Sequence, residues 1–211
     1  MLATPHRTVA VCPHNCQCQR PSAACRCEQK CPADAGVRQQ FLKAGEVVVS
    51  RIPCEITTVL GPCVAITFFH AASKLAAICH AMLPTPNGRA TPKDGDPLRW
   101  KYVCHAVPEL VRPFMTAGLR PSEVEVKIFG GAHLLPSPSC GSKSISVGSA
   151  NVVLARRLVA ENGFRISAAD VGGNAGRKLV FDTESGIVHI KRFASKIASR
   201  PQLRCLAKSA S

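Results

Sequence analysis

Residues 55–84 read EITTVLGPCVAITFFHAASKLAAICHAMLP, and this stretch contains the clearest strand pattern in the chain. Within residues 64–68, large apolar side chains alternate with smaller ones, which is the period of a half-buried strand. Residues 75–82 are again largely apolar, and residues 70–74 connect the two runs. The stretch therefore predicts an antiparallel β-hairpin, which ends at Pro84 because proline has no backbone NH to donate to a neighbouring strand.

The predicted hairpin brings a cysteine and a histidine together. Cys63 follows a Gly-Pro turn dipeptide at the start of the first strand, and His80 lies near the end of the returning strand. Because antiparallel partners pair in reverse order, these two ends of the hairpin are neighbours. Such a pair is typical of a packed core, and it is also the arrangement that a cysteine nucleophile requires.

A cysteine nucleophile needs a base or a cation beside it, because a free thiol with a pKa of about 8.5 is mostly protonated near neutral pH. His80 can supply either one. The histidine in turn needs a third group that holds its tautomer, and a hydroxyl can do so in place of a carboxylate. Thr57 and Thr58, about one strand length before Cys63, are both candidates for this group.

These residues resemble the signature of the CheD family, the chemoreceptor glutamine deamidases of bacterial chemotaxis. The resemblance begins with Thr57, with LGPCVA at residues 60–65 and with HAMLP at residues 80–84. It covers roughly residues 45–192. Its later blocks are VKIFGGA at residues 126–132, VGSANV at 147–152 and DVGGNAGRKLVFDTESGIVHIKR at 170–192.

The resemblance implies hydrolysis of glutamine side-chain amides on methyl-accepting chemotaxis receptors, which yields glutamate and ammonia. Some members of the family also hydrolyse glutamyl methyl esters. By this resemblance Cys63 attacks the amide carbon, His80 carries the proton to ammonia, and Thr57 orients His80. The resemblance implies no metal and no organic cofactor, and it implies the chemotaxis phosphatase CheC as a protein partner.

One departure from the family pattern lies next to the nucleophile. Pro62 stands where the family usually has serine, and a proline removes one backbone NH close to the place where an oxyanion would form. This departure favours an alternative function. In that alternative the chain is a catalytically weak or inactive binding module that keeps the CheD fold and regulates chemotaxis proteins.

Two glycine pairs, at residues 130–131 and 172–173, predict turns in which the backbone has a positive φ or passes close to another segment. In the resemblance these turns shape the cleft beside Cys63. Asn174 and Arg177 follow the second pair, and they are candidates for substrate contact because a binding cleft needs convergent polar groups.

The remaining elements favour an α+β fold, a layered sandwich of mostly antiparallel sheet with packed helices. Pro108 and Pro113 predict that the helical span 98–117 is two short helices or one kinked helix. Ser149 or Asn151 is the expected N-cap of a second helix. The sequence predicts further strands at 47–49, 123–129, 164–166, 179–181 and 187–190, and the second helix reaching to about residue 161.

The chain of 211 residues with 46% hydrophobic residues suits one globular domain. We expect a Cys-rich, disordered extension at 1–44, the deamidase domain at 45–192 and a basic tail at 193–211. The start lacks the apolar run of a secretory signal, and no later stretch approaches the roughly 18 apolar residues of a membrane span. We therefore expect a cytoplasmic protein with free thiols and no membrane insertion.

The net charge of +14 favours encounters with acidic partners without selecting one class of partner. Aromatic residues make up 5% of the chain and do not interleave with basic ones, which argues against sequence-specific nucleic-acid binding. Half of the 12 cysteines lie in residues 12–31, where thiolates could bind a soft metal. Their C-x-C and C-x-x-x-C spacing differs from that of common structural zinc sites, so metal binding stays the remoter alternative.

Overall fold

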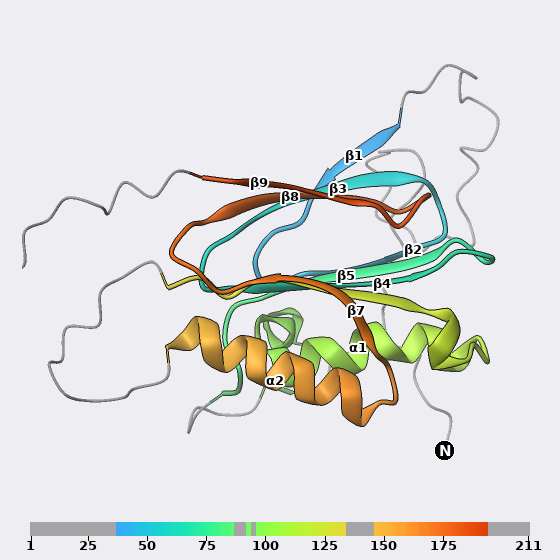
Figure 1. Ribbon diagram of the computed structural model, residues 1–211. Coiled ribbons are helices and arrows are strands. Elements are labelled where there is room, and N and C mark those ends of the chain that lie inside the picture. Colours follow the sequence, from blue (N-terminus) through green and yellow to red (C-terminus); the bar gives the residue numbers. More distant parts are fainter. Residues whose placement is uncertain (1–36, 87–91, 94–95, 134–145, 194–211) are drawn as a thin grey trace, which may run out of the picture.

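The computed structural model describes residues 37–86, 92–93, 96–133 and 146–193. These residues form three layers, two β-sheets and a layer of helices (Figure 1). Sheet A has the strand order β1 (Arg38–Phe41), β3 (Cys54–Leu60), β8 (Arg177–Asp182) and β9 (Val188–Arg192). Sheet B has the order β2 (Val47–Ser50), β5 (Leu75–Ala81), β4 (Val64–His70), β6 (Glu125–Gly130) and β7 (Ile166–Val171).

Sheet B is the middle layer, and the helices cover its outer face (Figure 1). The helices are η3 (Pro97–Lys101), α1 (Val103–Thr116), η4 (Pro121–Glu123) and α2 (Val147–Glu161). The pairings of β1 with β3 and of β6 with β7 are parallel, and the other pairings between the described strands are antiparallel. The predicted α+β sandwich with a mostly antiparallel sheet is therefore confirmed.

The predicted hairpin is present as β4 and β5, which pair from Val64 opposite Ala81 to His70 opposite Leu75. Every residue of both strands is buried, whereas the alternation predicted a half-buried strand. The reason is that both faces of β4 and β5 are covered, one by the helices and the other by sheet A. Successive residues alternate between the two faces, so that Ile66 and Phe68 point toward the helices, and Ala65 and Phe69 point toward sheet A.

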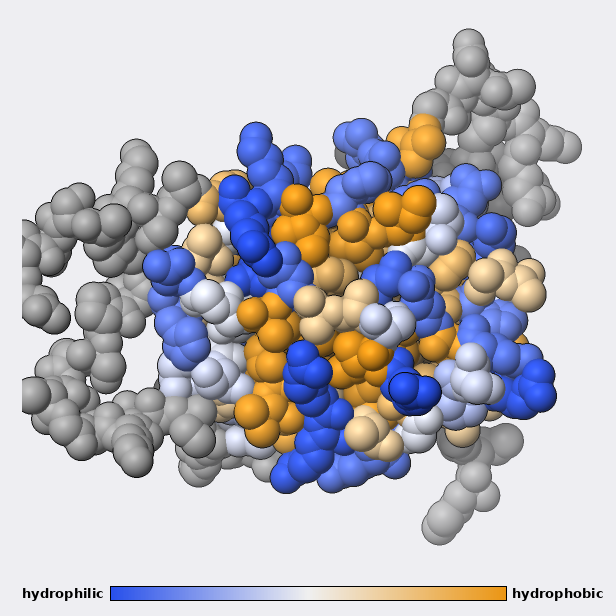
Figure 2. Space-filling model, viewed as in Figure 1, coloured by the Kyte–Doolittle hydropathy of each residue, from blue (hydrophilic) through white to orange (hydrophobic). Residues whose placement is uncertain are grey.

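Two apolar layers result. Between sheet B and the helices, Phe68 contacts Phe114 and Phe164, with ring centroids 5.7 and 5.2 Å away. Between the sheets, Ala65 and Ile78 of sheet B belong to one cluster with Phe181 of sheet A. Burying one such large side chain contributes about 1.5–3 kcal/mol, so these layers fix how the sheets are stacked. Figure 2 shows the edge that β7, β8 and β9 form, where apolar side chains gather between polar ones.

The N-terminal boundary lies earlier than the predicted residue 45. Residues 38–41 form β1 in parallel with β3, and Leu42 after it is fully buried between the sheets. The sequence RQQF has no apolar alternation, because this edge strand is held by backbone pairing rather than by a buried face. The cysteine cluster at 12–31 and the basic tail from 194 onward lie outside the described residues.

Two local predictions about the helices differ in detail from the structure. The span 98–117 is divided into two helices, η3 and α1, but the division falls at Tyr102, whose backbone is extended, and Pro108 and Pro113 both lie inside α1. Burial of the apolar face of α1 outweighs the local cost of the prolines. The N-cap of α2 is Ser146, whose side chain accepts a hydrogen bond from Ser149 N. The cap lies earlier than predicted, and Asn151 is therefore a residue of the helix interior.

The described cysteines, Cys54, Cys63, Cys79 and Cys104, are free thiols, as expected. Among the helices that the structure describes, none is long and apolar enough to cross a bilayer.

Candidate active site

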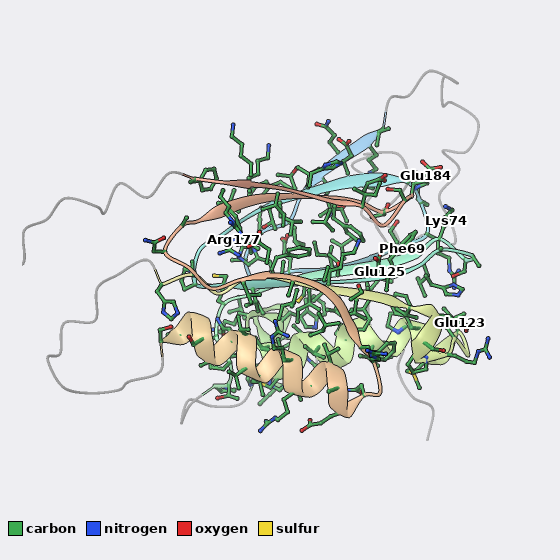
Figure 3. The ribbon with its side chains drawn as sticks, in the orientation of Figure 1. Phe69, Lys74, Glu123, Glu125, Arg177 and Glu184 are labelled. Carbon is green, nitrogen blue, oxygen red and sulfur yellow. The ribbon has the colours of Figure 1, made fainter. Side chains whose placement is uncertain are left out.

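The predicted site residues lie at the end of the sandwich where β3 turns into β4. Residues 61–63 make this turn, and the last residue of β3, Leu60, pairs with Arg177 at the start of β8. In Figure 3, Arg177 marks this end of the molecule, and Phe69 and Lys74 mark the opposite end. The glycine pairs at 130–131 and 172–173 lie at the same end as Arg177, because Gly172 N donates to Gly130 O and Arg177 binds Gly172 O.

The turn that carries Cys63 is held from outside at three successive carbonyl groups. Its carbonyl oxygens accept hydrogen bonds from two backbone NH groups after β6 and from one side chain of α2. The donors are Ala132 N to Gly61 O (2.8 Å), Asn151 Nδ2 to Pro62 O (3.0 Å) and Gly131 N to Cys63 O (2.8 Å). A turn with all three carbonyls bound is fixed before any substrate arrives.

Glycine is required where this turn meets its neighbours. A Cβ atom on Gly130, which has a φ of 104°, would lie 2.1 Å from Cys63 O. A Cβ atom on Gly148 of α2 would lie 2.6 Å from Gly131 O. The predicted close approach at residues 130–131 is therefore present, and it places the start of α2 directly against the backbone beside Cys63.

Cys63 is half-buried and packs against the cluster between the two sheets, on the same side of the hairpin as Ala65. Burial raises the pKa of the Cys63 thiol above its ordinary value, and its own backbone NH acts in the opposite direction. The thiol is consequently protonated at neutral pH. It needs a base that removes its proton during attack.

His80 is 6% exposed and faces sheet A. Its Nδ1 lies 2.8 Å from Thr58 Oγ1, and that hydroxyl also lies 2.8 Å from the carbonyl oxygen of Leu42. Thr58 has only one hydroxyl proton, and it must donate this proton to Leu42 because a carbonyl oxygen can only accept. Thr58 then accepts from His80, so the network assigns the ring proton to Nδ1 and leaves Nε2 with a free lone pair.

The free nitrogen of His80 is directed at the interior. Nε2 is buried and has no hydrogen-bond partner among the described residues. Burial lowers the pKa of His80 below its ordinary value of 6.5, against the smaller opposing effects of the Leu42 carbonyl and the Glu46 carboxylate. His80 is therefore a neutral imidazole at neutral pH, which is the form that acts as a base.

The hairpin register makes His80 and Cys63 diagonal neighbours. Ala65 lies directly opposite His80, and Cys63 lies two positions before Ala65 on the same face. Diagonal pairs of this kind have Cα atoms about 7–8 Å apart, within reach of long side chains. The predicted meeting of the thiol and the imidazole is thus supported by the register.

The threonine that reaches His80 is Thr58, not Thr57. Successive side chains of a strand point to opposite faces, and Thr58 is fully buried between the sheets. Thr57 therefore points to the outer face of sheet A, where it is half-buried, opposite Val180 in the register. The contact with His80 that the resemblance implies for Thr57 is made by its neighbour Thr58.

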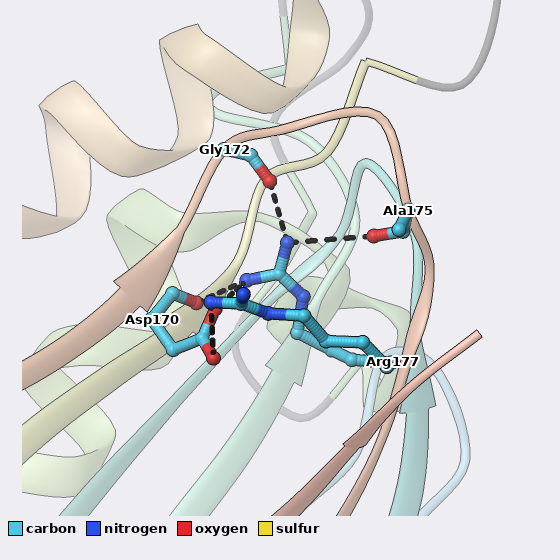
Figure 4. A network of polar contacts seen from close by, with 5 residues as sticks. Asp170, Gly172, Ala175 and Arg177 are labelled. Carbon is cyan, nitrogen blue, oxygen red and sulfur yellow. Dashed lines mark hydrogen bonds and ion pairs between the residues drawn. The ribbon is translucent and has the colours of Figure 1, made fainter. Parts of the chain in front are cut away.

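Arg177 is predicted to contact substrate, but its side chain is buried and binds a loop of the protein itself. The residue is 2% exposed, and its guanidinium donates to Asp170 Oδ1 (2.6 Å), Gly172 O (2.5 Å) and Ala175 O (3.4 Å) (Figure 4). It also donates to the Asp170 carbonyl. Arg177 therefore clamps the glycine-rich loop between β7 and β8. Asn174 is exposed on that loop and stays a candidate for substrate contact.

Sequence reasoning missed the role of Asn151. It expected a helix cap, whereas the side chain is fully buried and binds two carbonyl groups outside the helix. An amide at a core-facing position of a helix was the available signal. In the described part of the chain, no cluster of His, Cys, Asp and Glu residues is arranged to hold a metal ion.

Comparison with known proteins adds the following findings. A family model described as CheD chemotactic sensory transduction matches residues 82–192, which include Asn151 and Arg177 but begin after His80. A probable chemoreceptor glutamine deamidase CheD 2 from Geobacter sulfurreducens is 41% identical over 152 residues, covering 72% of this chain and 88% of that protein. A probable chemoreceptor glutamine deamidase CheD from Oleidesulfovibrio alaskensis is 40% identical over 183 residues, covering 84% and 85%.

Among solved structures, the hypothetical protein YfiH of Bacillus licheniformis has a TM-score of 0.38 and 13% sequence identity. That likeness covers 60% of this chain and 49% of the other.

Proposed function

Because this chain belongs to the CheD family, we propose that it is a protein-glutamine deamidase that converts chemoreceptor glutamines to glutamate and releases ammonia. One observation carries the proposal. The free Nε2 of His80 lies on the same face of the hairpin as the Cys63 thiol, and Thr58 holds the tautomer that leaves this nitrogen bare. The names of the relatives supply the substrate class.

In the first step the Cys63 sulfur attacks the side-chain amide carbon of glutamine. A carbon–sulfur bond forms, the carbonyl π electrons move to oxygen, and the thiol proton passes to His80 Nε2. Both groups begin neutral, because burial raises the pKa of the thiol and lowers the pKa of the imidazole. The pair therefore acts by proton transfer during attack, not as a preformed ion pair.

In the second step the tetrahedral intermediate collapses. The carbon–nitrogen bond breaks, His80 returns its proton to the leaving nitrogen, and ammonia departs from a thioester on Cys63. Water then attacks the thioester carbon while His80 takes a proton from it. The carbon–sulfur bond breaks, the proton returns to sulfur, and glutamate is released. The reaction needs no metal and no organic cofactor.

Thr58 acts through His80 in both steps. When Nε2 carries a proton, Nδ1 still donates to Thr58, so the ring keeps its orientation as the proton enters and leaves. The Leu42 carbonyl fixes the direction of this relay because it takes the only hydroxyl proton of Thr58.

The partners follow from the same proposal. The substrates are methyl-accepting chemotaxis receptors, and the site of action is the cytoplasm, where the modified helices of such receptors lie. The phosphatase CheC is proposed as a regulatory partner. Asn174, exposed on the loop that Arg177 clamps, is proposed to contact the receptor.

Mass spectrometry of a receptor cytoplasmic fragment tests the proposal. The fragment is incubated with this protein and, separately, with its Cys63→Ala variant, and its peptides are then mapped for glutamine-to-glutamate conversion. Conversion that requires Cys63 is expected. No conversion on several receptors, with a folded protein, would overturn the proposal.

The alternative, a catalytically weak or inactive binding module, rests on Pro62. The lost backbone NH stands next to Cys63, although the Pro62 carbonyl is well used as the acceptor for Asn151. Receptor binding by a protein that does not deamidate the bound receptor would favour this alternative.

A further inference from the structure

Asn151 joins the two halves of the site from a third element. Its side chain is fully buried in the first turns of α2, and Nδ2 donates to Pro62 O at 3.0 Å and to Met82 O at 2.9 Å. Pro62 directly precedes Cys63, and Met82 follows His80 by two residues. One amide group therefore binds the backbone of both strands, next to Cys63 on one strand and near His80 on the other.

This bridge lies where the β4–β5 pairing ends. The last paired residues are Val64 and Ala81, and beyond them Pro62 has no NH with which to continue the hydrogen-bonded ladder. The two strands present carbonyl groups there, and carbonyls cannot bind each other. The amide nitrogen of Asn151 has two hydrogens and supplies one donor to each strand.

The other end of the same amide has no partner. Oδ1 of Asn151 is buried without a hydrogen bond among the described residues. An unpaired buried acceptor lowers stability, but an apolar side chain of similar size would leave the Pro62 and Met82 carbonyls without the donors that Asn151 supplies. The two donors therefore account for the asparagine, because no apolar side chain can bridge two carbonyl groups.

The packing of α2 fixes the backbone position from which the Asn151 side chain extends. Gly148 packs against the Gly131 carbonyl so closely that a Cβ atom would not fit, and Ser146 caps the same turn. The side chain of Asn151 consequently starts from a backbone that is packed directly against the 130–131 turn. A rigid bridge of this kind can set a distance between the strands that it joins.

We propose that Asn151 is a positioning residue that sets the separation of Cys63 Sγ and His80 Nε2, by tying the backbone before the cysteine to the backbone after the histidine. The inference rests on the proposed function for its catalytic readout. It predicts that removal of the two donors separates the thiol from its base while both remain in the protein.

The test substitutes Asn151→Leu, which removes the donors and keeps a similar volume. On a receptor cytoplasmic fragment we expect kcat to fall about 10- to 100-fold, since small misplacements of reacting groups have effects of this size, and KM to stay within about twofold. Asn151→Ser keeps one donor and should fall between the two proteins. If Asn151→Leu does not fold, the kinetics of Asn151→Ser provide the test.

Two controls lie on the same helix. Asn162 donates Nδ2 to Leu158 O near the C-terminal end of α2, and Asn162→Ala removes this bond far from the site. Val159 is buried in the helix layer, and Val159→Ala lowers stability without touching the turn. Both should keep kcat. A kcat loss in Val159→Ala as large as that in Asn151→Leu at a matched melting temperature would overturn the positioning role.

A second readout needs no receptor. The rate at which iodoacetamide alkylates Cys63 is measured against pH by mass spectrometric peptide mapping. In the wild type, His80 takes the proton of the Cys63 thiol during alkylation. The alkylation rate should therefore follow the titration of His80. The Asn151→Leu profile should match that of His80→Ala, although the variant keeps its histidine. A wild-type profile in both asparagine variants would overturn the inference. An absence of deamidation by the wild type would overturn the proposed function and leave this second test standing.

Discussion

Cys79 and His80 are adjacent on β5, yet they face different layers of the molecule and have different chemistry. Cys79 points toward the helices, is fully buried among apolar side chains, and burial raises the pKa of its thiol to about 12. His80 points toward sheet A, where Thr58 binds one ring nitrogen and Cys63 lies on the same side. We therefore propose that a cysteine in this hairpin is reactive only on the face that also carries polar partners.

The difference follows from the middle position of sheet B. A strand with one wet face could place a nucleophile in solvent, but both faces of β4 and β5 are covered. The helix face packs into an apolar cluster with the buried side of α1 and α2. The sheet A face carries Ala65 and Ala76 together with larger residues such as Ile78, and it ends at the turn that carries Cys63. This end is where the interior can meet a substrate.

Replacing a cysteine by serine on each face of the hairpin should give the largest difference in deamidation rate. Cys63→Ser should lower the deamidation rate by about 1,000-fold or more, because a hydroxyl is a much weaker nucleophile than a thiol in this setting. Cys79→Ser should keep the rate within about twofold and instead lower the free energy of unfolding by roughly 1–3 kcal/mol, since it places a more polar hydroxyl in a fully buried apolar layer. Kinetics and urea denaturation check the pair. Equal rate losses would contradict the division of the faces.

The two neighbouring threonines offer the next largest contrast. Thr58→Val should lower kcat about 10- to 100-fold, because His80 loses the partner that fixes its tautomer. Thr57→Val should stay within about twofold, since that side chain lies on the outer face of sheet A. Thr58→Ser keeps the hydroxyl and should recover most of the rate. A severe loss in Thr57→Val with a mild one in Thr58→Val would show that the wrong threonine has been assigned.

The pH dependence tests the buried state of His80. Burial lowers the pKa of His80 below 6.5, so the base stays unprotonated to a lower pH than in an exposed histidine. The value of kcat/KM should hold down to pH 6.5 and then fall about tenfold per pH unit below the pKa of the folded state. No rise from thiolate formation is expected below pH 9, because burial raises the pKa of Cys63. An acidic limb centred above pH 7 would contradict the assignment.

Stability should change in the same pH region. The unfolded chain has a histidine pKa near 6.5, and the folded chain has a lower one, so the unfolded state binds more protons between the two values. The contribution of His80 is therefore fully present above pH 6.5 and is lost as the pH falls toward the folded pKa. Denaturation of the wild type and of His80→Gln at several pH values measures this term.

The smallest expected effect concerns Pro62. Pro62→Ser returns a backbone NH beside the nucleophile and leaves the carbonyl that Asn151 binds. We expect a gain in kcat of less than about tenfold, in keeping with one additional and imperfectly aimed donor. An unchanged rate would show that this NH is not used, and it would remove the support for the inactive-module alternative.

The hairpin could be predicted from sequence because its information is local. Strand period and turn residues gave the register, and the register made Cys63 and His80 neighbours. The choice of Thr58 over Thr57 could not be made in this way. It depends on which face of β3 meets β5, and these strands belong to different sheets.

The other partners come from distant or weakly patterned segments. Leu42, whose carbonyl fixes the tautomer, follows a polar edge strand that has no apolar alternation. Asn151 reaches the site from a helix whose seat depends on glycine contacts. The buried position of Arg177 depends on the loop that it clamps. Each of these contacts joins residues that are far apart in the sequence. It is marked there by a single residue and not by a repeating pattern, so its partner cannot be predicted.

Nitrogen NMR of the His80 ring, with selective labelling of histidine, observes the arrangement on which the mechanism depends. We predict that Nδ1 carries the proton at neutral pH, that Nε2 is bare, and that the ring titrates below pH 6.5. Thr58→Val should mix the two tautomers, and Thr57→Val should not. A proton on Nε2 in the wild-type protein would contradict the account, because the nitrogen that faces the interior could then not take the proton from Cys63.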